Sequence, residues 1–373
     1  METVLREAQN LINKGEPFVI ATVIGTKGST PQKPGAKLLV REDGSGVGTL
    51  GGGCVEGDIW FAAKMLLNEG GESQLQDYSL NEDIAAREGL VCGGTMYFLI
   101  DPVRDTKDLT SSFGKIVDAY DGGTSMGQAT LLKPSNNKGS VGDKLFLETD
   151  GSVSGSLGDA KREKEAIGAL EGLMDYGRVN YINTEDGSEI FLEGFTTPAS
   201  VVIAGGGHIG KSLAPLVKML GLKLYVVDDR PEFANKERFP EADEVVVAQY
   251  HEGLKQLDIR PNTAIIVATR GHREDDLALE AAALSPAGYV GLVGSRRKTI
   301  LIYEELLKNG MPKERIQAIH SPIGLDIGAK TPEEIALSIV SEIVAFREGR
   351  PGKSMAIEGR YIQRIANKVG VPS

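Results

Sequence analysis

The sequence predicts an α/β protein in which a mixed α+β domain precedes a C-terminal, doubly wound parallel sheet. Three observations carry this prediction. After residue 198, apolar strand-like runs alternate regularly with helix-like stretches. A glycine-rich turn joins the first of these runs to the first helix. Before residue 198, strands and helices follow one another without that alternation. Strict alternation is typical of parallel strands whose connecting helices cover both faces of the sheet.

The glycine turn reads Gly205-Gly-Gly-His-Ile-Gly210 and follows the predicted strand Ser200–Ala204. We expect Gly205 to make the tight turn, Gly207 to let a pyrophosphate approach the backbone, and Gly210 to let the helix lie close to the strand. A second apolar run ends at Asp228, where a carboxylate would hold a ribose 2′-hydroxyl. The combination indicates a Rossmann-like nucleotide-binding unit. A strand–helix–strand unit whose glycines only make the turn is the alternative.

The remaining strands of this region are predicted at Leu222–Val227, Glu244–Val247, Thr263–Ala268 and Gly288–Val293. Their helices are expected to start near His208, Glu232, His251, Glu274 and Arg296, with a last, capped helix from Thr331.

Loops that follow the fourth and fifth strands would border the ligand crevice, because the carboxyl ends of parallel strands meet at one sheet edge. Arg270 could bind phosphate there, and His272 could carry a proton, although a solvated helix cap explains the same stretch. Ser295 and Arg296 open the next helix within Gly294-Ser-Arg-Arg-Lys298. Cations at that end oppose the helix dipole, which favours a bound phosphate or acidic cofactor. His208, inside the turn, is expected near the cofactor or in a structural hydrogen bond.

Length and composition set the limits. The 373 residues predict at least two domains. A net charge of -11 argues against nucleic acid or an anionic membrane as partner. No apolar run approaches the roughly 18 residues that span a bilayer, and the first residues form an amphipathic helix pattern rather than a signal peptide. Two cysteines provide no disulfide framework, which fits the cytoplasm. Four scattered histidines define no local metal site, and no internal repeat is evident.

We place the domains at residues 1–197, with a sub-domain at 111–197, and at residues 198–348. The tail, residues 349–373, mixes basic and apolar residues and is expected to lie on a neighbouring surface or on a second protomer.

In the first domain, Cys54 is the best single candidate for chemistry. It follows three glycines and opens a predicted helix, where the positive end of the dipole favours a thiolate. Glu56 and Asp58 oppose this, and burial as a small apolar residue is an equal alternative. Cys92 lies in a second cysteine–glycine loop, so a shared ligand site is conceivable beside packing at a turn. The loop Lys27-Gly-Ser-Thr-Pro31 has the composition of an anion cradle or of a solvated surface loop.

Five segments together resemble the XdhC/CoxI family, the xanthine dehydrogenase accessory factors. They are Ala21–Pro31, Gly51–Glu56, Val202–Gly210, Gly291–Lys298 and Ser321–Ile335. The resemblance implies a homodimeric chaperone that binds the molybdenum cofactor (molybdopterin) and hands it to a molybdenum hydroxylase of the xanthine dehydrogenase type. A cysteine desulfurase is a further candidate partner. The stretch Arg270–Asp275 departs from the plainest family pattern, which leaves a role for His272 open.

Three functions therefore remain from the sequence, one of them a small-molecule-sensing or scaffold protein that differs from a chaperone only by lacking transfer. A cofactor-insertion chaperone is favoured over a catalyst. The alternative is an NAD(P)-dependent oxidoreductase, for which Asp228 would favour NAD but no acid or base for hydride transfer can be named.

Overall fold

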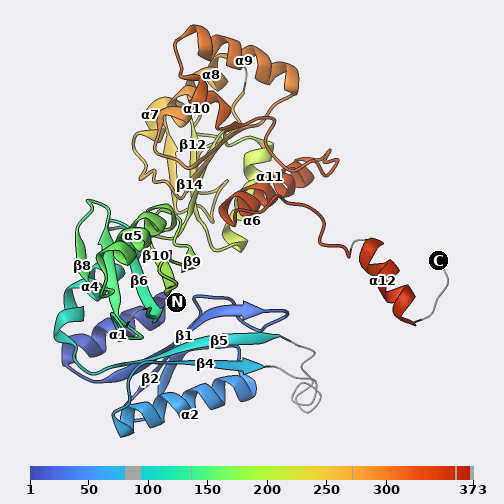
Figure 1. The fold of residues 1–373 in the computed structure, drawn as a ribbon. Coiled ribbons are helices and arrows are strands. Elements are labelled where there is room, and N and C mark those ends of the chain that lie inside the picture. The colour runs from blue at the N-terminus through green and yellow to red at the C-terminus, as the bar shows by residue number, and fades with distance from the viewer. Residues whose placement is uncertain (80–93, 136, 271, 358, 370–373) are drawn as a thin grey trace. The chain divides into compact units, whose positions relative to one another are not determined.

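The computed structural model describes residues 1–79, 94–135, 137–270, 272–357 and 359–369, and it separates into two compact units (Figure 1). Unit 1 comprises Met1–Pro198 and unit 2 comprises Ala199–Ser373. Among the described residues, no helix is long and apolar enough to span a membrane.

Unit 2 is built on a six-stranded sheet. Its strands are β11 (Ser200–Ala204), β12 (Lys223–Asp228), β13 (Glu244–Val247), β14 (Thr263–Val267), β15 (Tyr289–Leu292) and β16 (Ile319–His320). They run parallel in the order β13-β12-β11-β14-β15-β16. The strand order reverses between β11 and β14, and ligands of such sheets bind at this point. The predicted doubly wound parallel sheet is confirmed.

Helices cover both faces of this sheet because successive strand residues point to opposite sides. Val201 and Ile203 pack with α6 (His208–Met219) and α11 (Pro332–Arg347). Val202 and Ala204 pack in the core on the other face. The helices of that face are α7 (Tyr250–Leu254), α8 (His272–Leu284), α9 (Arg296–Lys308) and α10 (Lys313–Gln317). The predicted cap of α11 is confirmed, since Thr331 and Glu334 form a reciprocal capping box.

One predicted helix of unit 2 is wrong. No helix starts near Glu232, because residues 229–243 form a series of turns between β12 and β13. Arg230 and Arg238 fold back from these turns toward the glycine turn. At the C-terminus, α12 (Gly359–Val369) has no buried residue.

Unit 1 contains two five-stranded antiparallel sheets with the same strand order, β3-β2-β1-β5-β4 and β8-β7-β6-β10-β9. The first sheet and its helices comprise, in chain order, α1 (Glu2–Lys14), β1 (Phe18–Lys27), β2 (Lys37–Arg41), β3 (Gly46–Gly48), α2 (Gly53–Glu69), β4 (Gln74–Ser79) and β5 (Thr95–Val103). The second sheet and its helices comprise, in the same order, α4 (Thr110–Tyr120), β6 (Met126–Lys133), β7 (Lys144–Glu148), β8 (Val153–Gly155), α5 (Ala160–Met174), β9 (Val179–Asn183) and β10 (Glu189–Phe195).

Unit 1 is therefore an internal duplication, and the expectation that the chain has no repeat is wrong. We call residues 2–103 repeat 1 and residues 110–195 repeat 2. The register agrees, because Thr22 pairs with Lys37 in repeat 1 and Thr130 with Lys144 in repeat 2. Around the hairpin turn, Lys37–Ser45 and Lys144–Ser152 share Lys, Leu, Asp, Gly and Ser at equivalent places.

Two ion pairs join the repeats reciprocally. Lys37 of repeat 1 contacts Glu193 of repeat 2 at 2.8 Å, and Lys144 of repeat 2 pairs with Asp101 of repeat 1. Asp101 and Glu193 hold the same register position on β5 and β10, opposite Ile20 and Gln128. Equivalent residues thus pair across the contact between the repeats, as a local two-fold relation requires.

Candidate functional site

Three loops of repeat 1 meet at one end of its sheet. A Cβ added to Gly51 would lie 2.6 Å from Pro31, and one added to Gly94 would lie 2.3 Å from the Ser29 carbonyl oxygen. The β1–β2 loop, the loop before α2 and the start of β5 therefore touch. We call residues 27–31, 51–54 and 94 the Cys54 loop cluster. The structure brings together two of the segments that the sequence singled out, and Cys92 lies outside the described residues.

Cys54 is exposed as the second residue of α2. It follows Gly51, Gly52 and Gly53, whose φ angles of 112°, 75° and 67° suit glycine and strain other residues. The helix starts without a side-chain cap from Gly52. The thiol therefore stands at the positive end of the α2 dipole, as expected, and of the two alternatives for its environment the structure has the exposed one.

Glu56 holds the glycine loop in place. Its carboxylate accepts hydrogen bonds from the Thr49 hydroxyl at 2.6 Å and from the backbone N–H groups of Leu50 and Gly52 at 2.7 and 3.3 Å. Burial raises the pKa of Glu56, but these hydrogen bonds outweigh it and lower the pKa below its usual value. Glu56 therefore stays ionised and holds the loop that precedes Cys54.

Repeat 2 keeps the same loop frame. Glu163 accepts hydrogen bonds from the Ser156 hydroxyl at 2.6 Å and from the Leu157 N–H at 2.8 Å, as Glu56 does in repeat 1. A Cβ added to Gly155 would lie 2.2 Å from the Lys144 carbonyl, and the matching distance from Gly48 to Lys37 is 2.3 Å. The two repeats can therefore be compared residue by residue at this end.

In repeat 2, a buried ion pair lies between the loops that correspond to the Cys54 loop cluster. Arg162, which is 1% exposed, stands where repeat 1 has Val55. Its guanidinium donates to the carbonyls of Lys138 and Leu157 at 2.8 and 2.7 Å and to Asp186 at 2.9 Å. Counting back from Glu193 and Asp101, Asp186 corresponds to Gly94.

Repeat 1 has neither member of this ion pair. It has Val55 and Gly94 in their places, an exposed thiol, and a longer connection before its last strand, residues 80–94 against residues 184–188. The frame is shared, but only repeat 1 has an exposed thiol in it, which makes the Cys54 loop cluster the better candidate for ligand binding.

In unit 2, the three motif glycines have different surroundings. A Cβ added to Gly205, whose φ is 125°, would lie 2.3 Å from the Ala268 carbonyl. One added to Gly210 would lie 2.2 Å from the Gly205 carbonyl. The tight turn and the close helix packing are thus accounted for within the chain. At Gly207 a Cβ would meet nothing within 4 Å, and φ is an ordinary −67°. Nothing in the chain itself requires glycine there, so the phosphate role of Gly207 stays a prediction.

The amino terminus of α6 has no side-chain cap, and His208, its first residue, is exposed. The backbone N–H groups of the first turn are the groups that bind anions at a helix start. Space beside Gly207 and uncapped N–H groups therefore occur at one place.

Asp228 does not present an oxygen to solvent. Its side chain is fully buried. One oxygen accepts hydrogen bonds from the N–H and Nε of Arg230 at 3.1 and 2.9 Å. The other accepts from the Gly206 N–H at 2.8 Å and from Nη2 of Arg230 at 3.0 Å. Burial raises the pKa of Asp228, but the hydrogen bonds and the charge of Arg230 outweigh burial, so the pKa lies below its usual value. Its role in ribose binding stays a prediction that would require Arg230 to move.

The other predicted contacts lie on the β14 and β15 side. Arg270 is exposed and contacts Asp229 and Glu274 at 3.5 Å each. Ser295 caps α9, because its hydroxyl accepts from the Lys298 N–H at 3.2 Å. Arg296 is exposed, and no hydrogen bond or ion pair of its side chain occurs within the described residues. The side chain of His272 lies outside the described part of the structure.

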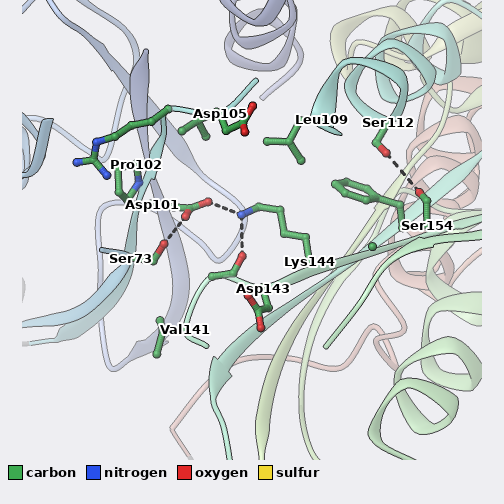
Figure 2. Close-up of a pocket in the computed structure, with 15 residues that line it drawn as sticks. Ser73, Asp101, Pro102, Asp105, Leu109, Ser112, Val141, Asp143, Lys144 and Ser154 are labelled. Atoms are coloured by element: carbon green, nitrogen blue, oxygen red, sulfur yellow. Dashed lines mark hydrogen bonds and ion pairs between the residues drawn. The ribbon is translucent and has the colours of Figure 1, made fainter. Parts of the chain in front are cut away.

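A cavity of about 570 Å³ between the repeats was not predicted (Figure 2). Its floor is the Asp101–Lys144 pair, where Ser73 donates to Asp101 at 2.6 Å and Lys144 donates to the Gly142 carbonyl at 3.0 Å. These polar groups are already satisfied within the protein. No periodic pattern marks the cavity, because its residues come from both repeats. Across the described ranges, no cluster of His, Cys, Asp and Glu is arranged to hold a metal.

Comparison with known proteins assigns the family. Residues 201–343 match the XdhC Rossmann domain, and residues 11–79 match the XdhC and CoxI family. The chain belongs to the XdhC/CoxI family.

Two relatives and one solved structure extend over most of the chain. A probable xanthine dehydrogenase subunit of Bacillus subtilis (strain 168) is 27% identical over 91% of this chain and 96% of the relative. The molybdenum cofactor insertion chaperone PaoD of Escherichia coli (strain K12) is 21% identical over 92% and 88%. A crystal structure of a xanthine dehydrogenase from Bacillus halodurans is 26% identical, with a TM-score of 0.63 over 94% of this chain and 98% of that one.

Proposed function

We propose that this protein is an accessory factor that binds the molybdenum cofactor and delivers it to a molybdenum hydroxylase of the xanthine dehydrogenase type. Membership of the XdhC/CoxI family supports the accessory role. Similarity to a protein named as a molybdenum cofactor insertion chaperone supports the cargo.

The observation that carries the proposal is the difference between the two repeats of unit 1. Repeat 2 fills its loop cluster with the buried pair of Arg162 and Asp186. Repeat 1 has an exposed Cys54 at a helix start, beside the Lys27–Pro31 loop. The cofactor supplies a molybdenum centre with sulfur ligands, and a thiol is a suitable soft ligand or neighbour for such a centre. Cys54 would hold the metal end, with Cys92 as a second candidate.

The cofactor also carries a phosphate, or a nucleotide joined through it. In unit 2, Gly207 leaves room at the uncapped start of α6, and Arg270, Ser295 and Arg296 lie at the ends of neighbouring strands. We assign to these residues, with Gly205, His208 and Gly210 as the frame of the turn, the binding of a phosphate group. Homodimer formation and a cysteine desulfurase partner belong to the same proposal.

An NAD(P)-dependent oxidoreductase is the alternative. The glycine turn favours it, but both oxygens of Asp228 are engaged by Arg230 and Gly206. His208 is exposed at the turn, but nothing in the described residues positions it as an acid–base partner for hydride transfer. We therefore rank this activity second.

The test is co-purification of the cofactor from a host that makes it. Pterin would be measured by fluorescence after oxidation and molybdenum by mass spectrometry. Cys54→Ala should reduce both about tenfold or more without unfolding the protein. Lys161→Ala is the matched control, because Lys161 occupies the equivalent position at the start of α5. Equal retention of cofactor by both variants would remove Cys54 from the site. Bound NADH with turnover of a small substrate would favour the alternative.

A further inference from the structure

We propose that Arg230 closes the nucleotide-binding edge of unit 2 to adenine dinucleotides and leaves the predicted phosphate position beside Gly207 uncovered. The inference rests on the proposed function for its positive part, the phosphate. Its negative part, the exclusion of NAD and NADP, rests on the contacts around Asp228 alone.

The first step is the occupancy of Asp228. In dinucleotide-binding units, a carboxylate at the end of the second strand accepts hydrogen bonds from the ribose. Here Asp228 ends β12 at that position, but three of its four donors come from Arg230 and the fourth from Gly206. Two of these bonds form a bidentate guanidinium–carboxylate pair, the strongest geometry for such contacts. The protein's own cation thus takes the acceptor that a ribose would need.

The second step is the covering of this pair. The Arg230 guanidinium lies 3.6 Å from the centre of the Phe233 ring, and Arg238 lies 5.1 Å from the same ring. Nε of Arg238 donates to the Gly206 carbonyl at 2.8 Å. The Phe233 carbonyl is so close to Gly206 that an added Cβ would lie 2.0 Å from it. Residues 230–238 therefore pack directly onto the turn, on the side of β12 where the adenosine half would lie.

The third step is the neighbouring acid. Asp229, the next carboxylate after β12, is 13% exposed and contacts Arg230 at 3.7 Å and Arg270 at 3.5 Å. Oδ1 of Asp229 is buried but receives no hydrogen bond within the described residues, so the block at this strand end rests on the contacts of Asp228 and on the burial of Asp229. By contrast, a Cβ added to Gly207 at the start of α6 would meet nothing within 4 Å, and Arg296 at the start of α9 is exposed. The strand end that would bind the adenosine ribose is therefore covered, whereas the space beside Gly207, at the predicted phosphate position, is open.

The test is calorimetric titration of the full-length protein with NAD⁺, NADP⁺ and inorganic phosphate. The wild type should bind neither dinucleotide with a Kd below about 1 mM. Arg230→Ala and Arg230→Gln should uncover Asp228 and improve NAD⁺ affinity by about tenfold or more. Adding Asp228→Asn to either variant should abolish that gain. Lys236→Ala is the matched control, because Lys236 lies in the same segment but donates to the Ala242 carbonyl rather than to the turn or Asp228, and it should give no gain.

Three results would overturn the inference. One is tight binding of NAD⁺ by the wild type. Another is a clear preference of the wild type for NADP⁺, which would mean that Arg230 reads a 2′-phosphate. The third is an unchanged NAD⁺ affinity in both Arg230 variants. If Arg230→Ala does not fold, Arg230→Gln and the wild-type titration still test the inference. If the wild type binds neither NAD⁺ nor phosphate, the exclusion stands and the proposed phosphate site fails.

Discussion

Breaking the buried ion pair between the repeats should destabilise unit 1 far more than breaking its partially solvated equivalent. Lys37 and Glu193 have side-chain exposures of 4% and 2%, and Nζ of Lys37 contacts both carboxylate oxygens and the Thr22 hydroxyl. Lys37→Met would leave Glu193 as an uncompensated buried charge. Removing one partner of such a pair costs about 3–5 kcal/mol.

The equivalent substitution in repeat 2 sets the comparison. Lys144 and Asp101 have exposures of 13% and 11% and form the floor of the cavity, where water can solvate the remaining carboxylate. Ser73 also continues to donate to Asp101. Lys144→Met should therefore cost less, about 1–3 kcal/mol. The double variant Lys37→Met with Glu193→Leu removes both charges and should return to within about 1 kcal/mol of the wild type.

Trp60 provides the assay. It is the single tryptophan of the chain, it lies on α2 of repeat 1, and its indole N–H donates to the Gly44 carbonyl at 3.1 Å. Its fluorescence during urea unfolding therefore reports on unit 1. A loss of about 4 kcal/mol should lower the urea midpoint by about 2 M at a typical slope of about 2 kcal/mol per M. An equal loss at Lys144, or a double variant no more stable than Lys37→Met, would refute the reasoning.

Three further outcomes are expected. Gly210→Ala should destabilise unit 2 in thermal unfolding, since its Cβ would lie 2.2 Å from a carbonyl oxygen. Gly207→Val should cost about 1 kcal/mol or less of stability at the helix cap but abolish phosphate binding in calorimetry. Hydroxyl hydrogen bonds from Ser135 and Thr184 hold the pKa of Asp186 well below its ordinary 3.8. The ionised Asp186 therefore stabilises the fold at neutral pH, and this stabilisation is lost as the pH falls below 3.8 toward the lowered pKa. Asp186→Asn should flatten the acid side of the stability curve measured by Trp60 fluorescence, and an unchanged curve would contradict this. Lys298→Met should destabilise unit 2 by about 3 kcal/mol, because it leaves the buried Asp275 carboxylate without its cation. Arg296→Met is the control and should change stability little; both are measured by urea unfolding followed by circular dichroism.

The sequence was sufficient for the features that depend on neighbouring residues. Strand and helix periodicity located the parallel sheet, and the spacing of Gly205, Gly207 and Gly210 located its turn, because turn geometry is set within a few residues. The three glycines before Cys54 likewise located the helix start, whereas exposure and burial of its thiol were equal alternatives that the fold decided. The capping box of α11 follows the same logic, since its two members are three residues apart.

Tertiary structure decided the rest. The duplication of unit 1 is preserved in strand order and register, while the sequence retains only short matches such as Lys37–Ser45 with Lys144–Ser152. That shared Lys-Leu and Asp-Gly-Ser pattern was the available signal. Asp228 was correctly placed at a strand end, but which donor would take its oxygens depended on how residues 229–243 fold. Long-range pairs such as Lys37 with Glu193 join residues far apart in the chain, and only the packed fold determines which charge lies opposite which.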